Sequence, residues 1–149
     1  MSSNILPPGV VEVTEAGPDG FTQVVKVGRH VLTADEPLDG GGTDMGPGPY
    51  DYLLVALGSC KSMTVRLYAR RKGWPLERVA VRLKHGKIHA QDCMDCETRE
   101  GRLDLIEAEI ELTGSLEPEQ RARLLEIADR CPMHRTLVSE IVIRTRLVP

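Results

Sequence analysis

The sequence predicts an α+β fold, built as one domain over residues 1–149. Short segments that alternate apolar and polar residues, typical of β-strands, occur near the start, in the middle and at the end of the chain. Between them lie two longer segments with apolar residues every three or four positions, typical of amphipathic helices. Strands and helices do not alternate one by one as in a parallel sheet, so the order indicates α+β rather than α/β.

The start of the chain predicts a β-hairpin followed by a third strand. Residues 10–14 and 21–27 alternate in polarity, and a Pro-Asp-Gly turn at residues 18–20 separates them. Residues 30–34 continue as the third strand. The next segment, residues 39–49, contains five glycines, which predicts a flexible surface loop without regular structure. Further strands are predicted at residues 79–83, 87–89, 103–112 and 138–147.

A long helix is predicted over residues 50–72, which contain no proline. Pro49 suits the first turn of a helix, and Gly73 suits the position just beyond its end. A second helix is predicted over residues 118–130, because the acidic residues at its start favour a helix N-terminus. The inner face expected for the first helix consists of Leu53, Leu57, Cys60, Met63, Thr64, Leu67 and Tyr68.

Composition and charge exclude several classes of protein. The net charge is −3 at pH 7, so no basic surface for nucleic acid is expected. No run approaches the ~20 apolar residues that a membrane-spanning helix needs. The N-terminus lacks the basic and apolar regions of a signal peptide, which predicts a cytoplasmic protein. In that compartment cysteines are more often catalytic, redox-active or metal-binding than structural.

Cys60 lies on the apolar face of the first predicted helix. A buried and inert thiol at this position is one interpretation, because a free cysteine packs as a small hydrophobic residue. Gly58 and Ser59 favour the other interpretation, since a glycine inside a helix costs about 1 kcal/mol and indicates that a neighbour approaches closely. A reactive thiol also needs a nearby cation, which must come from elsewhere in the fold.

Cys131 lies at the junction between the second helix and Pro132. If residues 133–138 open with a helical turn, Cys131 is its N-cap and the sulfur faces unpaired N–H groups, which lowers a thiol pKa. The alternative is a helix end that Pro132 simply terminates. His134 and Arg135 add positive potential there, or are solvated.

Two separated motifs together resemble the OsmC/Ohr family of thiol-dependent peroxidases. They are GPGPYDYLLVALGSC at residues 46–60 and CPMHRTL at residues 131–137. The resemblance covers nearly the whole chain. It implies an intertwined homodimer in which strands from both chains wrap two long central helices. The broad apolar faces favour the same assembly, with more than ~2,000 Å² buried in total.

The resemblance also implies an activity and its residues. Cys60 is the thiol that a hydroperoxide oxidises to sulfenic acid, and Cys131 is the resolving thiol that forms a disulfide with it. An external dithiol then reduces the disulfide, and no cofactor is implied. The substrate pocket is expected to include Tyr50, Leu53, Leu57 and Met63, whose aliphatic members favour organic hydroperoxides.

The chain departs from the family pattern before the long helix. Peroxidases of this family carry a glutamate ten residues before the reactive cysteine, paired with an arginine that activates it. Here that position is Tyr50, with Asp51 beside it, and the nearest upstream arginine is Arg29. Arg29 and Asp51 are therefore the candidate activating residues. The departure also motivates an alternative, a small-ligand-binding protein that keeps the fold and its interfacial pocket without peroxidase activity.

A third motif, HAQDCMDCE at residues 89–97, contains a Cys-x-x-Cys pair. His89, Cys93 and Cys96, with His85 or Asp92, offer enough donors for a zinc site, although a single such pair is a weak signal. An auxiliary redox role and two incidental thiols in a polar loop are the alternatives. The family pattern has no cysteines at these positions, so the resemblance is silent about this motif, and the expectation is no metal. If Cys60 and Cys131 meet where the two helices cross, this loop should lie well away from them.

Overall fold

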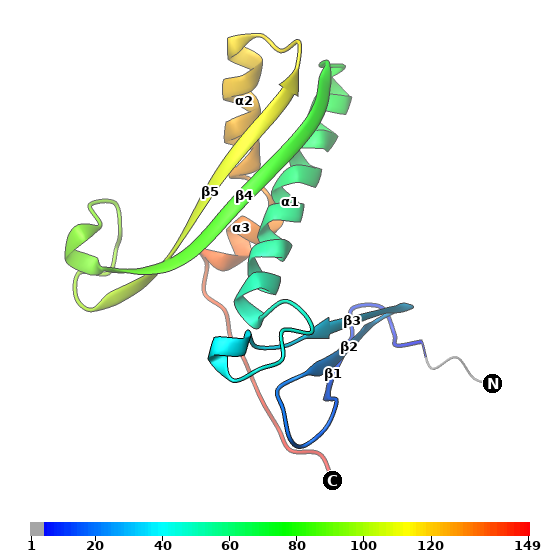
Figure 1. Cartoon of the computed structure of the whole chain (residues 1–149). Coiled ribbons are helices and arrows are strands. Elements are labelled where there is room, and N and C mark those ends of the chain that lie inside the picture. Colours follow the sequence, from blue (N-terminus) through cyan, green and yellow to red (C-terminus); the bar gives the residue numbers. More distant parts are fainter. Residues whose placement is uncertain (1–4) are drawn as a thin grey trace. The chain divides into compact units, whose positions relative to one another are not determined.

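The computed structural model describes residues 5–149 (Figure 1). Its separate groups of strands and helices confirm the α+β class. The chain divides into two compact units, Met1–Leu53 and Leu54–Pro149, and helix α1 (Pro49–Lys72) begins in the first and continues into the second. Whether the units form one domain stays a prediction. None of the helices within residues 5–149 is long and apolar enough to cross a membrane.

The first unit contains a three-stranded antiparallel sheet. Its strands are β1 (Val11–Glu15), β2 (Gln23–Val27) and β3 (His30–Ala34), in the order β1-β2-β3. The alternating polarity of the sequence therefore correctly predicted both the hairpin and the third strand. After β3 the chain forms a short 3₁₀ turn, η1 (Leu38–Gly40), and then the irregular glycine-rich loop.

The Asp35 carboxylate holds the glycine-rich loop in place. Asp35 is only 3% exposed, and its carboxylate accepts hydrogen bonds from the Thr43 hydroxyl (2.7 Å), the Thr22 hydroxyl (3.0 Å) and the backbone N–H groups of Glu36 (2.8 Å) and Met45 (3.2 Å). These donors, the Thr43 hydroxyl first, lower the pKa of Asp35 to about 2. The loop is irregular and largely exposed, as expected, but it is anchored rather than free.

Two glycines of this loop are required by close backbone approach. A Cβ atom on Gly46 would lie 2.3 Å from the Thr33 carbonyl oxygen, and one on Gly42 would lie 2.0 Å from the Glu36 carbonyl oxygen. Neither backbone oxygen can move aside without disturbing β3 or the turn that follows it. The glycines therefore bring the loop against the end of the sheet.

The second unit is built on a long antiparallel ribbon. Strands β4 (Leu76–His89) and β5 (Arg102–Gly114) pair along almost their whole length, and η2 (Ala90–Asp92) begins their connection. The two strands predicted at residues 79–83 and 87–89 are in fact one, because Gly86 stays in the ladder opposite Leu105. Helix α2 (Pro118–Ala128) and helix α3 (Pro132–Leu137) follow.

The core of this unit lies between the helices and one face of the ribbon (Figure 1). Helix α1 turns Leu57, Gly58, Lys61, Val65 and Ala69 inward. The predicted inner face was therefore wrong at Met63 and Leu67, which are 70% and 49% exposed. The buried face is rotated from the expected one and includes Lys61, a residue that an apolar periodicity does not select. The buried cluster consists of Val65, Ala69, Leu76, Leu116, Leu124 and Ala128.

The last predicted strand, residues 138–147, does not form in this structure. Beyond α3 the chain has no regular secondary structure, and Ile141, Val142 and Ile143 are exposed. Strand pairing requires an adjacent sheet edge, and this segment is paired with no strand of its own chain. The alternating polarity alone did not reveal this.

Replacing Gly46 with alanine should destabilise the protein, because the new Cβ overlaps the Thr33 carbonyl. We expect the free energy of unfolding to fall by about 1–3 kcal/mol, measured by chemical denaturation. Gly48→Ala is the matched control, since Gly48 also precedes a proline and its Cβ would meet only ordinary contacts of 3.5 Å or more. Equal stability of the two variants would contradict this explanation of Gly46.

Acid should weaken the anchored loop. The pKa of Asp35 is about 2 in the folded chain and about 3.8 without its partners, so its contribution to stability is complete above pH 4 and is lost as the pH falls toward 2. Asp35→Asn should be less stable than wild type at pH 7 and should lose less stability between pH 4 and pH 2. Denaturation curves across this range test it, with Asp39→Asn in the same loop as control. Parallel pH curves for wild type and Asp35→Asn would be inconsistent with this role.

Candidate redox site

Cys131 connects α2 to α3 and is completely buried. It is the N-cap of α3, with Pro132 at the first helical position, and its sulfur accepts a hydrogen bond from the His134 backbone N–H at 3.3 Å. The helical turn predicted after Pro132 is thus confirmed, and so is the N-cap position of Cys131.

The Cys60 side chain lies close enough to Cys131 to act on its thiol. Burial raises the pKa of Cys131, and so do the hydrogen bond with the Cys60 side chain and the charge of that residue; the His134 N–H and the positive charge of Lys61 act in the opposite direction. The net direction is upward. The N–H group at the N-cap lowers the pKa of Cys131, as expected, but the loss of solvent outweighs it.

Cys60 lies at the edge of the buried face of α1 and is half-buried. It is not in a disulfide. The glycine two residues before it allows α1 to approach the ribbon, since a Cβ on Gly58 would lie 2.6 Å from the Leu83 side chain of β4. Close approach at Gly58 was predicted correctly. The neighbour, however, is a leucine of the sheet and not the backbone of the second helix.

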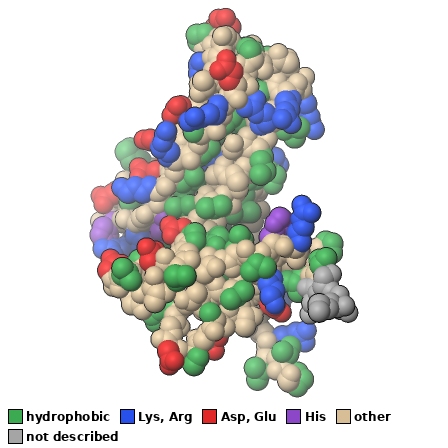
Figure 2. Space-filling view, turned by 45° about the vertical axis from the view of Figure 1, so that its right-hand side comes forward, with side chains coloured by type: hydrophobic (Ala, Val, Ile, Leu, Met, Phe, Trp, Pro, Cys, Tyr) green, Lys and Arg blue, Asp and Glu red, His purple; other side chains and the backbone are tan. Residues whose placement is uncertain are grey.

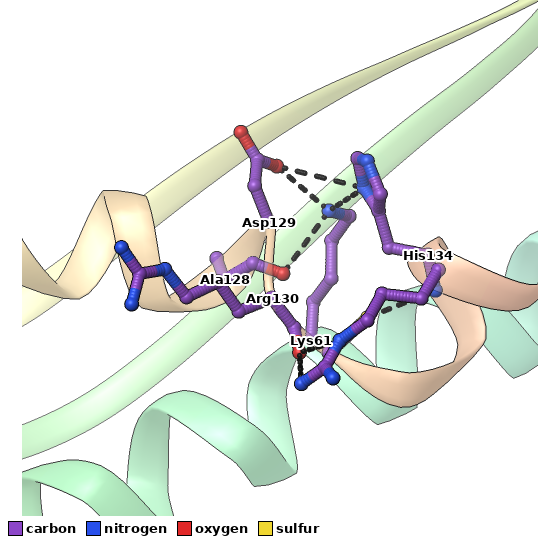
Figure 3. Close-up of polar contacts among 7 residues, drawn as sticks. Lys61, Ala128, Asp129, Arg130 and His134 are labelled. Carbon is purple, nitrogen blue, oxygen red and sulfur yellow. Dashed lines mark hydrogen bonds and ion pairs between the residues drawn. The ribbon is translucent and has the colours of Figure 1, made fainter. Parts of the chain in front are cut away.

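Lys61, the residue after Cys60, is a buried cation that the sequence reading missed (Figure 3). Its side chain is 3% exposed, and its ammonium group contacts the Ala128 carbonyl oxygen (3.2 Å), Asp129 Oδ1 (2.9 Å) and His134 Nδ1 (3.0 Å). An ammonium group has three donors, and here each has an acceptor. The ion pair and these hydrogen bonds offset the cost of burying the charge.

The same contacts fix the protonation of the histidine ring. Because an ammonium group only donates, His134 Nδ1 must accept, which places the proton of a neutral imidazole on Nε2. His134 Nδ1 also lies 3.7 Å from Asp129 Oδ1. Arg135 instead turns to the Arg130 carbonyl, to which its guanidinium donates two hydrogen bonds. Of the two cations proposed near Cys131 from the sequence, His134 joins the cluster and Arg135 supports the backbone beside it.

The two candidate activating residues lie in the first unit. Arg29 occupies the exposed turn between β2 and β3, and Asp51 is in the first turn of α1. The Asp51 carboxylate accepts a hydrogen bond from the Gly48 backbone N–H at 2.9 Å, which caps the start of the helix. Asp51 therefore has a structural role, and a role of either residue in activating Cys60 stays a prediction.

The predicted pocket residues differ in burial. Leu57 is buried, Leu53 is half-buried, and Tyr50 and Met63 are exposed. Their grouping into one pocket remains a prediction. A hollow between β5 and α2 contains none of them. It is lined by Ile110, Leu112, Arg121, Ala122 and Leu125.

The Cys-x-x-Cys pair lies in the connection between β4 and β5. Cys93 and Cys96 form a disulfide in this structure, with their Cα atoms 5.5 Å apart. Figure 1 shows this connection at the far end of the ribbon, beyond the part against which the helices pack. His85, one of the proposed metal ligands, instead contacts the Asp104 carboxylate at 2.8 Å across the ribbon.

Comparison with known structures shows the fold. The chain is similar to an OsmC-like protein from Mycoplasma pneumoniae (19% identity, TM-score 0.66, covering 92% of this chain and 89% of that one). It is also similar to an organic hydroperoxide resistance protein OsmC from Legionella pneumophila (15%, TM-score 0.62, 87% and 88%). A third similar structure is the organic hydroperoxide resistance protein OhrB of Bacillus subtilis (15%, TM-score 0.58, 87% and 90%).

Comparison with curated protein sequences finds no match. A family model does match, however: the model for OsmC-like protein covers residues 40–146. This range contains both cysteine motifs, the whole of α1 and the ribbon. The resemblance identified in the two motifs is therefore confirmed, and the chain belongs to the OsmC-like protein family.

Proposed function

We propose that this protein is a thiol-dependent peroxidase that reduces hydroperoxides, with organic hydroperoxides preferred. The observation that carries the proposal is the proximity of the Cys60 and Cys131 side chains, which lie 71 positions apart in the sequence. Two free thiols that lie close together can be oxidised to a disulfide without a large rearrangement. Similar structures named organic hydroperoxide resistance proteins support the substrate class.

The burial of the two thiols assigns their roles. Cys131 is completely buried, whereas Cys60 is half-buried, so a hydroperoxide meets Cys60 first. The Cys60 thiolate attacks the terminal oxygen of the hydroperoxide. The O–O bond breaks, the sulfur becomes a sulfenic acid, and the alkoxide takes a proton and leaves as the alcohol. Cys131 then attacks the Cys60 sulfur, which forms the disulfide and releases water.

Lys61 supplies the cation that the resolving step requires. Its positive charge lowers the pKa of Cys131 and opposes the effect of burial. The ammonium group is held in place by its hydrogen bonds to Asp129 and His134. An external dithiol of the cytoplasm then reduces the Cys60–Cys131 disulfide by thiol–disulfide exchange, which restores the two thiols and completes the cycle.

Exposed hydrophobic side chains support a homodimer as the working form. Figure 2 shows such side chains at the surface, and several belong to elements predicted to pair between chains. In an intertwined dimer, residues 138–147 would gain from the second chain the sheet edge that they lack in their own. The exposed set includes Phe21, Val31, Met63, Leu125, Ile141, Val142 and Ile143.

A second candidate function is the binding of a small ligand without peroxide chemistry. Two observations favour it: Tyr50 occupies the position of the family glutamate, and the neighbouring Asp51 carboxylate already caps α1. Under this alternative, Cys60 and Cys131 would pack in the core without reacting with hydroperoxide. The two functions differ in whether Cys60 consumes hydroperoxide.

Replacing Cys60 with serine should abolish hydroperoxide consumption, because the nucleophile is lost. Cys131→Ser should instead allow one turnover, leaving Cys60 as a sulfenic acid that a dimedone-type probe traps. The activity of both variants is measured as the consumption of an organic hydroperoxide, at limiting and at excess reductant. Ser62→Ala on the same helix is the control and should match wild type. Undiminished turnover by Cys60→Ser would eliminate the peroxidase mechanism and leave ligand binding.

Replacing Lys61 with methionine should raise the pKa of Cys131 further, because the methionine side chain keeps the length but not the charge. The measurement is the pH dependence of Cys131 alkylation, resolved by mass spectrometry in a Cys60→Ser background. Lys61→Arg keeps the positive charge, so the pKa of Cys131 should rise less than in Lys61→Met. Lys72→Met at the end of α1 should leave the pKa of Cys131 unchanged. If Lys61 has only a structural role, Lys61→Met should lower the free energy of unfolding and leave the pH midpoint of Cys131 alkylation unchanged.

A further inference from the structure

The connection between β4 and β5 brings two cysteines and an aspartate together. The two ends of the connection are joined beside the ribbon, because Ala90 is buried and its N–H donates to the Gly101 carbonyl at 2.8 Å. Within the turn, the Cys93 N–H donates to the Ala90 carbonyl at 3.2 Å. The 3₁₀ turn η2 therefore starts the connection in a fixed conformation. The segment after η2 presents its cysteines at the surface, half-buried.

Three metal-ligating atoms converge in this segment. The two sulfur atoms of Cys93 and Cys96 and a carboxylate oxygen of Asp95 all lie within 4.8 Å of one another. His89, which the sequence reading proposed as a ligand, is not in this group, and Asp95 takes its place. Two thiolates and a carboxylate are ligands that zinc accepts, at a tetrahedral centre whose fourth position is left to solvent.

The charges of the segment favour a cation over a reactive thiol. Residues 89–97 contain Asp92, Asp95 and Glu97 and no lysine or arginine. A nucleophilic thiolate needs a neighbouring positive charge, as Lys61 provides beside Cys131. Beside Cys93 lies the Asp95 carboxylate instead, 3.3 Å from its sulfur, so a thiolate there is stabilised when a cation binds between the two groups.

We infer that, when the disulfide is reduced, Cys93, Asp95 and Cys96 form a site for a thiophilic divalent cation of the zinc class. Binding displaces the protons of both thiols. Oxidation removes the site: hydrogen peroxide takes two electrons from the two thiols, the S–S bond forms, and two molecules of water are released. A disulfide sulfur carries no negative charge and is a poor zinc ligand. The structure shows the oxidised state, in which the S–S bond is formed.

Zinc titration of the reduced full-length protein tests the inference. In a Cys60→Ser Cys131→Ser background, where the loop holds the remaining thiols, we expect one zinc ion per chain by calorimetry. Cobalt in place of zinc should give a thiolate-to-metal charge-transfer band. Binding should disappear after oxidation with hydrogen peroxide and return on reduction. Cys93→Ser should reduce binding to the background level, and Asp95→Asn should weaken it at least about tenfold.

Two comparisons make the test decisive. Asp92→Asn removes a carboxylate of the same loop that is outside the group of donors, and it should weaken binding far less than Asp95→Asn. Should the background variant fail to fold, the difference in zinc bound between reduced wild type and Cys93→Ser Cys96→Ser gives the same answer. No difference between those two proteins, or equal binding by the disulfide form, would overturn the inference. Peroxidase activity does not enter either readout.

Discussion

The ion pair between Lys61 and Asp129 determines how the redox site is assembled. It joins the middle of α1 to the end of α2, two elements that are 68 positions apart in the sequence. The same ammonium group reaches the Ala128 carbonyl and the His134 ring, so it fixes both sides of the α2–α3 junction. Cys131 lies at that junction as the N-cap of α3, and Cys60 lies on α1 directly before Lys61.

In the proposed peroxidase, the positive charge near the thiols has a different source from the one that the family resemblance implies. The glutamate and arginine of the resemblance are absent from their expected positions, and the nearest equivalents, Asp51 and Arg29, lie at a helix cap and an exposed turn. Lys61 brings a positive charge to the thiol pair from a different place, the position directly after Cys60. In the proposed mechanism this cation acts on Cys131, as the resolving thiol.

Local patterns predicted most of the fold, and long-range contacts explain what they missed. Polarity alternation located the first three strands and β5, and the proline after Cys131 located α3. The strand expected at residues 138–147 does not form, since none of the strands within residues 5–149 pairs with this segment. Lys61 was missed because a lysine in a helix is ordinarily solvated, and only the fold supplies its three acceptors. The disulfide between Cys93 and Cys96 could not be predicted from the sequence either, since a Cys-x-x-Cys spacing permits free thiols, metal-bound thiolates and a disulfide alike.

The central claim is that Cys60 and Cys131 form one redox pair. Peptide mapping after addition of one equivalent of an organic hydroperoxide to the reduced protein tests it most directly. The account predicts a new cross-linked peptide containing Cys60 and Cys131, formed at the same rate as the hydroperoxide disappears. A Cys60 that remains reduced, or that is linked to Cys93 or Cys96 instead, would contradict it.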